Sequence, residues 1–132
     1  MTGFELALSC LALNIYHEAA FEPPTGQYAV AFVTINRAAK HNGDICKEVF
    51  KPRQFSWAND ALDKNGKLLP KFLPTNNPRW KQSRAVAKIA LTGDIVDFTG
   101  GATHYHADYI KQPTWAKKLT FVGKHGVHLF YR

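Results

Sequence analysis

Cysteine is scarce in this chain, which has two cysteines among 132 residues. Cys10 lies in an apolar stretch, where a thiol usually behaves as a small buried hydrophobe, and Cys46 lies in a short amphipathic one. We therefore expect no disulfide framework. A chain of this length can bury one hydrophobic core without disulfides or a structural metal, so the sequence predicts a single domain over residues 1–132, acting as a monomer.

The chain also lacks a basic N-terminal segment and a long uninterrupted apolar run. No Lys or Arg precedes the apolar stretch 6–13, which soon reaches Asn14, His17 and Glu18. Such a stretch is too short to cross a bilayer. We therefore predict no signal peptide and no stable membrane insertion, so that the protein is made in the cytoplasm.

Acidic residues are few, with 10 Asp and Glu against 17 Lys and Arg, and the net charge is +7. This balance favours a polyanionic partner, such as nucleic acid, an anionic membrane surface or the polymers of a bacterial wall. The basic residues are spread in ones and twos from Arg37 to Arg132, whereas a nucleic-acid surface usually concentrates them on one face. We therefore expect no nucleic-acid partner.

Apolar residues dominate residues 4–20 on nearly all sides, which is typical of a buried central helix that ends before Pro23-Pro24. A second buried helix is predicted from Thr25 or Gly26 to about Arg37, and a short third over 44–50. The segment 54–76 is loop-like. Asn77 and Pro78 are typical of a helix start and Gly93 of its end.

The pattern changes to alternation after Gly101. A strand there would place His104 and His106 on one face and Thr103 and Tyr105 on the other. A second strand is predicted over 127–131. The fold class is therefore α+β, a mainly helical domain with a small antiparallel β-hairpin near the C-terminus.

Glu18 is the candidate catalytic residue. It follows an apolar helix and precedes Ala19, Ala20 and Phe21, so burial and the helix C-terminus should both raise its pKa. A carboxyl group with a raised pKa can protonate the leaving oxygen of a glycosidic bond near neutral pH. Glu22, four residues on, could be a second carboxylate or could hydrogen-bond the loop backbone, and we favour the supporting role.

Two later segments combine aromatic rings with hydrogen-bonding groups, as in grooves that hold N-acetyl sugars. We expect Phe55 to anchor its loop in the core. The predicted substrate-binding residues are Gln54, Ser56, Trp57, Thr103, His104, Tyr105, His106 and Trp115.

Several motifs, taken in order, resemble the catalytic domain of the spore-cortex-lytic enzyme family of cell wall hydrolases. The similarity runs from about Leu11 to the C-terminus, and many members carry Arg-Gly where this chain has Ala20-Phe21. The motifs are Glu18-Ala19, Glu22-Pro23, Gly26-Gln27, Asn36-Arg37, Gln54-Phe55-Ser56, Gly101-Ala102-Thr103 and Phe130-Tyr131 after His128.

The resemblance implies a lysozyme-like fold. It also implies cleavage of peptidoglycan glycan strands between N-acetylmuramic acid and N-acetylglucosamine, by a lytic transglycosylase or a muramidase, without a cofactor. Family members that act in germination usually add an export signal and a wall-binding region. The compact form resembles a bacteriophage endolysin, made in the host bacterial cytoplasm and acting on the cell wall.

Two other functions are compatible with the residues. His104 and His106 on one strand, with His125 or His128 on the next, could supply three ligands to zinc in a peptidoglycan amidase or peptidase. We rank this below a glycosidase without a metal, because Asp108 is the one acidic residue nearby. A non-catalytic basic module that binds wall polymer or nucleic acid would not depend on Glu18.

Overall fold

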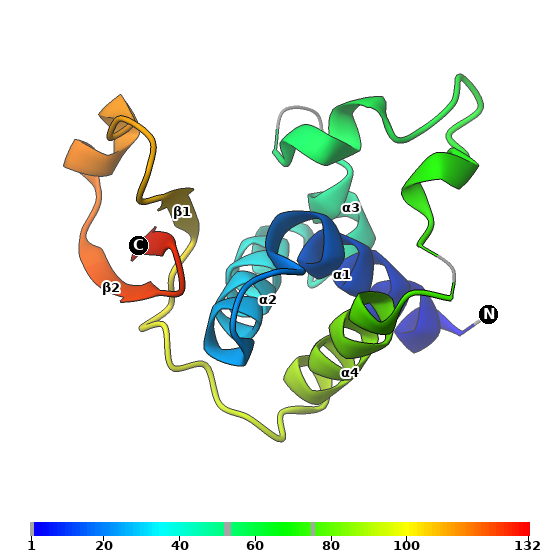
Figure 1. Cartoon of the computed structure of the whole chain (residues 1–132), viewed down its shortest axis with the longest axis horizontal. Helices are drawn as coiled ribbons and strands as arrows, with labels where there is room; N and C mark the ends of the chain where they lie inside the picture. Colours follow the sequence, from blue (N-terminus) through cyan, green and yellow to red (C-terminus); the bar gives the residue numbers. More distant parts are fainter. Residues whose placement is uncertain (1, 52–53, 75) are drawn as a thin grey trace.

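The computed structural model describes residues 2–51, 54–74 and 76–132, which form four α-helices, short 3-10 turns and one three-stranded sheet (Figure 1). The helices are α1 (Gly3–Ala19), α2 (Pro24–Ala38), α3 (Ile45–Val49) and α4 (Pro78–Thr92). The strands are β1 (His104–Ala107), β2 (Phe121–His125) and β3 (His128–Tyr131). The 3-10 turns are η1 (Ala39–His41), η2 (Ser56–Asp60), η3 (Pro70–Phe72) and η4 (Thr114–Lys118).

The helix boundaries follow from capping chemistry. The Asn77 side chain accepts a hydrogen bond from the backbone N–H of Arg79 at 2.9 Å, and Pro78 occupies the first position of α4. Gly93 ends this helix with φ of 80°, a left-handed conformation that glycine adopts without a steric penalty. The α4 prediction is confirmed.

The core lies on both sides of α2, which runs between the other helices and the sheet (Figure 1). One buried cluster joins α2 to α1, α3 and α4, and includes Leu11, Phe32, Val49 and Val86. A smaller cluster joins the end of α1 and the other side of α2 to the sheet, through Ala19, Val30, Val33, Ala102 and Phe130. Helix α1 is less central than the sequence indicated, since Phe4 is 44% and Leu6 49% exposed.

The sheet has the strand order β1-β3-β2, with both pairs antiparallel. The two predicted strands exist, but they do not form the hairpin. The hairpin consists of β2 and β3, and β1 pairs with the far edge of β3. Strand β2 escaped sequence analysis because a register shift between Phe121 and Gly123 interrupts its alternation.

A disulfide joins Cys10 of α1 to Cys46 of α3, so the expectation of unpaired cysteines was wrong. The two residues are 36 positions apart, and their pairing follows from the packing of α1 against α3. A disulfide that closes a loop of this length restricts the unfolded chain and stabilises the fold.

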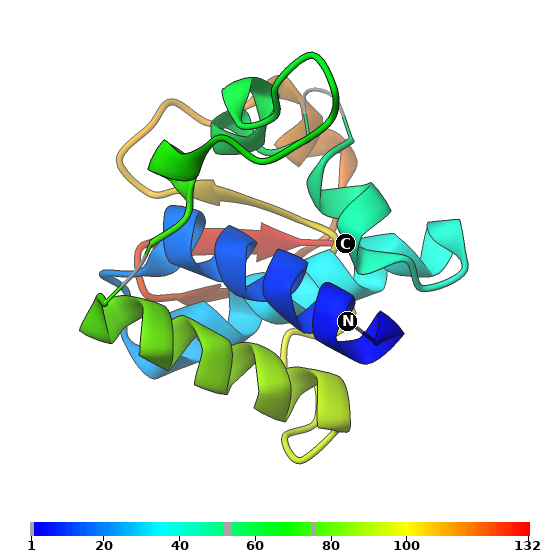
Figure 2. The same ribbon diagram turned by 90° about the vertical axis from the view of Figure 1, so that its right-hand side faces the viewer.

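The segment from Gln54 to Pro74 lies over the helices (Figure 2), where η2, η3 and an isolated bridge between Leu62 and Leu68 give it structure. Phe55 is buried, as predicted. Among the described residues, no helix combines the length and apolar character needed to cross a membrane.

Candidate active site

Glu18 lies in the last turn of α1, where the helix meets the sheet. Its carboxylate accepts a hydrogen bond from the Tyr105 hydroxyl, at 2.6 Å to Oε1. Burial raises the pKa of Glu18, and the Tyr105 hydrogen bond lowers it by a smaller amount. Burial also raises the pKa of Tyr105 well above its usual value, so this hydroxyl stays protonated and donates. The position therefore favours a carboxyl group that can carry a proton.

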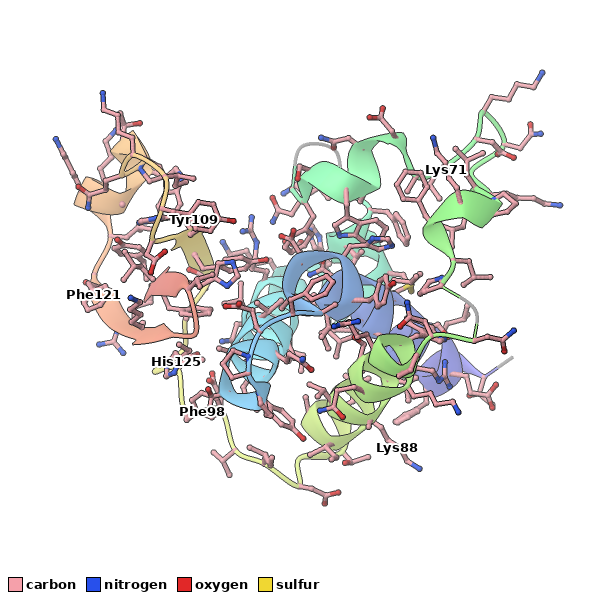
Figure 3. All side chains as sticks on the ribbon, viewed as in Figure 1. Lys71, Lys88, Phe98, Tyr109, Phe121 and His125 are labelled. Carbon is pink, nitrogen blue, oxygen red and sulfur yellow. A yellow bond between two sulfur atoms is a disulfide. The ribbon has the colours of Figure 1, made fainter. Side chains whose placement is uncertain are left out.

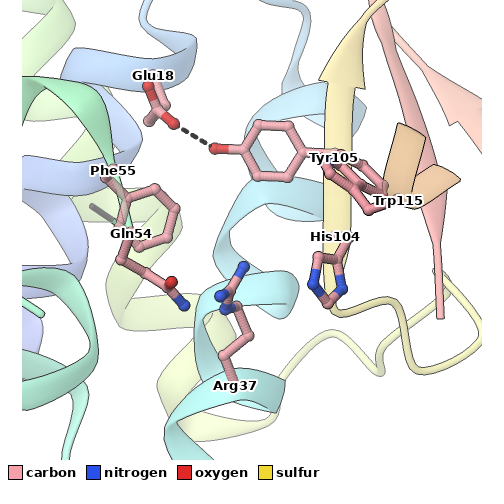
Figure 4. A pocket seen from close by; sticks show the side chains of 7 residues that line it. All are labelled: Glu18, Arg37, Gln54, Phe55, His104, Tyr105 and Trp115. Carbon is pink, nitrogen blue, oxygen red and sulfur yellow. Dashed lines mark hydrogen bonds between the residues drawn. The ribbon is translucent and has the colours of Figure 1, made fainter. Parts of the chain in front are cut away.

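Glu18 opens onto a cavity of about 260 Å³ between the helices and the sheet (Figure 4). The other lining residues come from α2, the start of the 54–76 segment, β1 and η4. They are Arg37, Gln54, Phe55, His104, Tyr105 and Trp115. Residues that are up to 97 positions apart in the chain, Glu18 and Trp115, thus share one small space.

Arg37 is the main lining residue that sequence analysis did not assign to the site. Its Nε donates to Oε1 of Glu48 at 2.8 Å and its Nη1 donates to the Thr103 carbonyl at 3.2 Å. Gln54 also donates to Oε1 of Glu48, and His41 Nε2 lies 3.0 Å from Oε2. The buried Glu48 therefore holds Arg37 and Gln54 at the cavity wall.

The acidic partner Glu48 stays ionised. Burial favours its neutral form, but hydrogen bonds from Gln54 and Arg37, with the positive charge of Arg37, outweigh that effect and lower its pKa. The sequence contained one signal for the pair of Arg37 and Glu48, which was the position of Arg37 after Asn36 in a motif that resembles the family.

The sheet side of the cavity shows the predicted alternation. Tyr105 points to Glu18, whereas the rings of His104 and His106 both contact Trp115, with centroids 5.2 and 5.8 Å apart. His104 lines the cavity, and burial and the charge of Arg37 lower its pKa. His106 is buried, and its Nε2 lies 2.8 Å from the Tyr131 hydroxyl. The Thr103 hydroxyl lies 2.9 Å from His104 Nδ1 and orients that ring.

Four residues predicted to bind substrate are not among those that line this cavity, namely Ser56, Trp57, Thr103 and His106. The Trp57 indole stacks on His17, with centroids 4.4 Å apart, and its Nε1 donates to Asn14 at 2.8 Å. It packs half-buried against the helical core. Ser56 is exposed. We therefore correct the expected position of Trp57, because a buried amide supplied the partner that its N–H needed.

A second cavity, of about 240 Å³, shares Glu18 with the first and is otherwise lined by different residues. The Glu22 carboxylate lines it and accepts a hydrogen bond from the backbone N–H of Val127 at 2.7 Å. Gly126, with φ of 60°, lets the turn between β2 and β3 approach, because a Cβ there would collide with Glu22. Glu22 thus holds this turn, and His128 Nδ1 lies 3.6 Å from the same oxygen.

The histidines predicted as alternative zinc ligands pack against aromatic rings. His104 contacts Trp115, His106 contacts Tyr131, and His125 lies against Phe98. Within the described ranges, no group of three His, Cys, Asp or Glu side chains is arranged to hold a metal ion. The set of ligands that a zinc enzyme needs is therefore not assembled by these residues.

A mainly helical domain whose small sheet faces a buried carboxyl group at a helix end has the lysozyme-like α+β fold. The model of the cell wall hydrolase family matches residues 21–131, and the chain belongs to this family of enzymes. Glu18 precedes the range that the family model matches, but the similarity to solved structures covers 97% of the chain. A search of curated proteins finds no match.

Two solved structures are similar. The catalytic domain of the Bacillus cereus SleB protein is 25% identical with a TM-score of 0.74, and the match covers 97% of this chain and 91% of that one. The catalytic domain of the germination-specific lytic transglycosylase SleB from Bacillus anthracis is also 25% identical, with a TM-score of 0.73 and coverage of 96% and 93%.

Proposed function

We propose that this protein is a lytic transglycosylase that cleaves peptidoglycan between N-acetylmuramic acid and N-acetylglucosamine. The observation that carries the proposal is the environment of Glu18: a carboxyl group with a raised pKa, at a cavity wall, with one oxygen held by Tyr105. The similarity to a structure described as a lytic transglycosylase supports it.

The proposed reaction uses Glu18 twice. The protonated carboxyl group gives its proton to the glycosidic oxygen as the bond from that oxygen to C1 of the muramic acid breaks. The resulting carboxylate then takes the proton of the muramic acid C6 hydroxyl, whose oxygen forms a new bond to C1. The products are a free hydroxyl on the departing sugar and a 1,6-anhydro ring, and Glu18 is protonated again.

One carboxyl group is sufficient for this sequence, whereas most glycoside hydrolases place two across the bond. Among the described residues that line the first cavity, Glu18 is the one acidic side chain. The Glu22 carboxylate accepts from the backbone at Val127. This distribution favours a lytic transglycosylase over a muramidase with two carboxylates.

Mass spectrometry of digested peptidoglycan tests the reaction. We expect the products to carry 1,6-anhydromuramyl ends, and we expect treatment with a chelator to leave the activity unchanged. Reducing muramic acid ends would identify a muramidase instead. Freed peptides, with activity lost on chelation and restored by zinc, would identify a metal-dependent amidase or peptidase and overturn the proposal.

We further propose that the protein serves as a bacteriophage endolysin, made in the host bacterial cytoplasm and acting as a monomer on the wall. The basic charge favours an anionic wall, and the Cys10–Cys46 disulfide suits the oxidising space outside the inner membrane. Expression in a bacterial host should cause lysis only after the inner membrane is permeabilised. Absence of lysis after permeabilisation, with active protein recovered from the cells, would contradict this role.

A further inference from the structure

Two aromatic rings are exposed at the second cavity, although the first cavity already supplies the catalytic carboxyl group. Phe21 is 81% exposed and Tyr109 is 79% exposed, and both line the second cavity together with Glu18 and Glu22. Phe21 lies in the turn after α1, and Tyr109 lies in the loop after β1, on the sheet side of the molecule in Figure 3. Both residues line the second cavity, although they come from distant parts of the chain. Single exposed apolar side chains are common, but two exposed rings that line one cavity beside Glu18 form an apolar surface of the kind that marks a ligand-binding groove.

The two cavities share the proposed catalytic group, because Glu18 lines both of them. An enzyme that cleaves inside a polymer must hold sugar units on both sides of the broken bond. The first cavity, of about 260 Å³, and the second, of about 240 Å³, are each slightly smaller than the sites of about 300–1,000 Å³ that hold a whole small ligand, so each suits a part of a longer ligand. Two such cavities that share Glu18 fit a chain of sugars that passes over this residue.

The position of Phe21 is supported by a cation. The guanidinium carbon of Arg79, in the first turn of α4, lies 4.1 Å from the centroid of the Phe21 ring. This contact is within the range of a cation–π interaction, and it orients the ring without burying it. Phe21 is also one of the two positions, Ala20-Phe21, at which the chain departs from the family motif.

We propose that Phe21 and Tyr109 form a second glycan-binding subsite at the second cavity, which stacks on the sugar units of the same strand. This inference rests on the proposed function, since its ligand is the strand that Glu18 cleaves. Each ring would cover the apolar C–H face of a pyranose and remove it from water. The positive charge of Arg79 beneath Phe21 suits a strand whose stem peptides carry carboxylates.

Titration of a peptide-free hexasaccharide of alternating N-acetylglucosamine and N-acetylmuramic acid into the Glu18→Gln protein tests the subsite. Adding Phe21→Ala or Tyr109→Ala should each raise Kd by about three- to tenfold. Phe21→Tyr and Tyr109→Phe keep a ring and should bind within about twofold of the parent protein. Both side chains are exposed, so we expect all four variants to fold.

Phe121→Ala is the matched control, because Phe121 is 54% exposed on β2 and lines neither cavity. Adding Phe121→Ala to the Glu18→Gln protein should not change the Kd for the hexasaccharide. An unchanged Kd in the double variant Phe21→Ala/Tyr109→Ala would overturn the subsite, as would an equal loss of affinity in Phe121→Ala.

A separate measurement keeps this test distinct from that of the reaction. With Glu18 present, the double variant should still make 1,6-anhydromuramyl ends, at a raised KM and an almost unchanged kcat. If the parent enzyme makes no such ends, the proposed reaction fails, while the titration still decides whether Phe21 and Tyr109 bind glycan.

Discussion

Glu48 is buried, with 2% of its side chain exposed, and Glu18 is half-buried, yet the structure raises the pKa of Glu18 and lowers the pKa of Glu48. Glu18 accepts a hydrogen bond from Tyr105, and burial raises its pKa. Glu48 has Arg37, Gln54 and His41 around it, and its pKa is lowered. Burial alone therefore does not set the protonation state of a carboxyl group. The donors and positive charges that the fold brings to it decide between an acid and a structural anion.

Glu18 and Glu48 also have different roles at the first cavity. Glu18 meets the cavity directly, whereas Glu48 acts through Arg37 and Gln54, which it holds at the wall. The comparison predicts that removing the charge at each position has different consequences, one for the reaction and one for the fold.

The largest effect is expected for Glu18→Gln, which keeps the shape of the side chain and removes the transferable proton. Activity should fall by about 10³-fold, equivalent to about 4 kcal/mol in the barrier. Stability at pH 7 should be kept or increased, because a carboxyl group with a raised pKa disfavours the folded state once it ionises. Product analysis and urea denaturation measure the two effects. Activity within a few-fold of the parent, in a folded variant, would refute the role of Glu18.

The disulfide links the helix of Glu18 to the helix of Glu48, and its removal should weaken both regions. The Cys10→Ala/Cys46→Ala variant lacks the cross-link between two residues that are 36 positions apart. We expect the free energy of unfolding to fall by about 3 kcal/mol. Urea denaturation with and without reductant measures it. Reductant should lower the stability of the parent protein and leave the variant unchanged. A parent protein that reductant does not affect would contradict the prediction.

Glu48→Gln should lower stability by about 2 kcal/mol at pH 7, because Arg37 loses the charge that faces it. This is less than for a fully buried pair, since the Arg37 side chain is 20% exposed. A carboxylate whose pKa is lowered in the folded state contributes to stability at pH values above its ordinary pKa. This contribution is lost as the pH falls through the lowered pKa. The difference from the parent should therefore shrink below pH 4.5, the ordinary value for Glu.

Urea denaturation over this pH range measures the Glu48 effect. Glu5→Gln, an exposed position in the first turn of α1, is the control and should change stability little at any pH. Equal losses in both variants would show that Glu48 has no special role.

The smallest effect is expected for Tyr105→Phe, which removes the hydrogen bond that Tyr105 donates to Glu18. That hydrogen bond lowers the pKa of Glu18, so its loss should raise the pKa further. Activity requires the protonated acid and declines as pH rises through this pKa, so the alkaline limb of the pH profile should move to higher pH. The rate on the plateau should fall by about fivefold, as for the loss of about 1 kcal/mol.

A pH–rate profile of Tyr105→Phe, beside Tyr28→Phe as a control in the helical core, measures this shift. An alkaline limb that stays in place, or one that moves to lower pH, would show that Tyr105 does not set the pKa of Glu18.

Local chemistry made the helices predictable. Prolines at the starts of α2 and α4, the cap at Asn77 and the left-handed Gly93 act on neighbouring residues, so the sequence contains the whole signal. Strand β1 was found for the same reason, since His104, Tyr105 and His106 alternate as the strand requires. Strand β2 was missed because Gly123 and the shift beside it break the period on which the prediction depended.

Contacts between distant segments could not be predicted in this way. The fate of Trp57 depended on Asn14 and His17, which lie about 40 positions earlier and offer the indole a hydrogen bond and a stacking partner. The pairing of Cys10 with Cys46 likewise depended on how α3 packs against α1.

The sequence by itself determined the helices and the two strands that alternate, because these rest on periodicity and caps along the chain. It also determined the choice of Glu18 as the candidate acid, which rests on its apolar neighbours together with the motifs that resemble a family of cell wall hydrolases. Only the tertiary structure decided which groups surround each carboxylate: Tyr105 for Glu18, and Arg37 with Gln54 for Glu48. The physical reason is that hydrogen bonds and desolvation act over a few ångströms in space, and folding alone brings residues distant in the chain to that range.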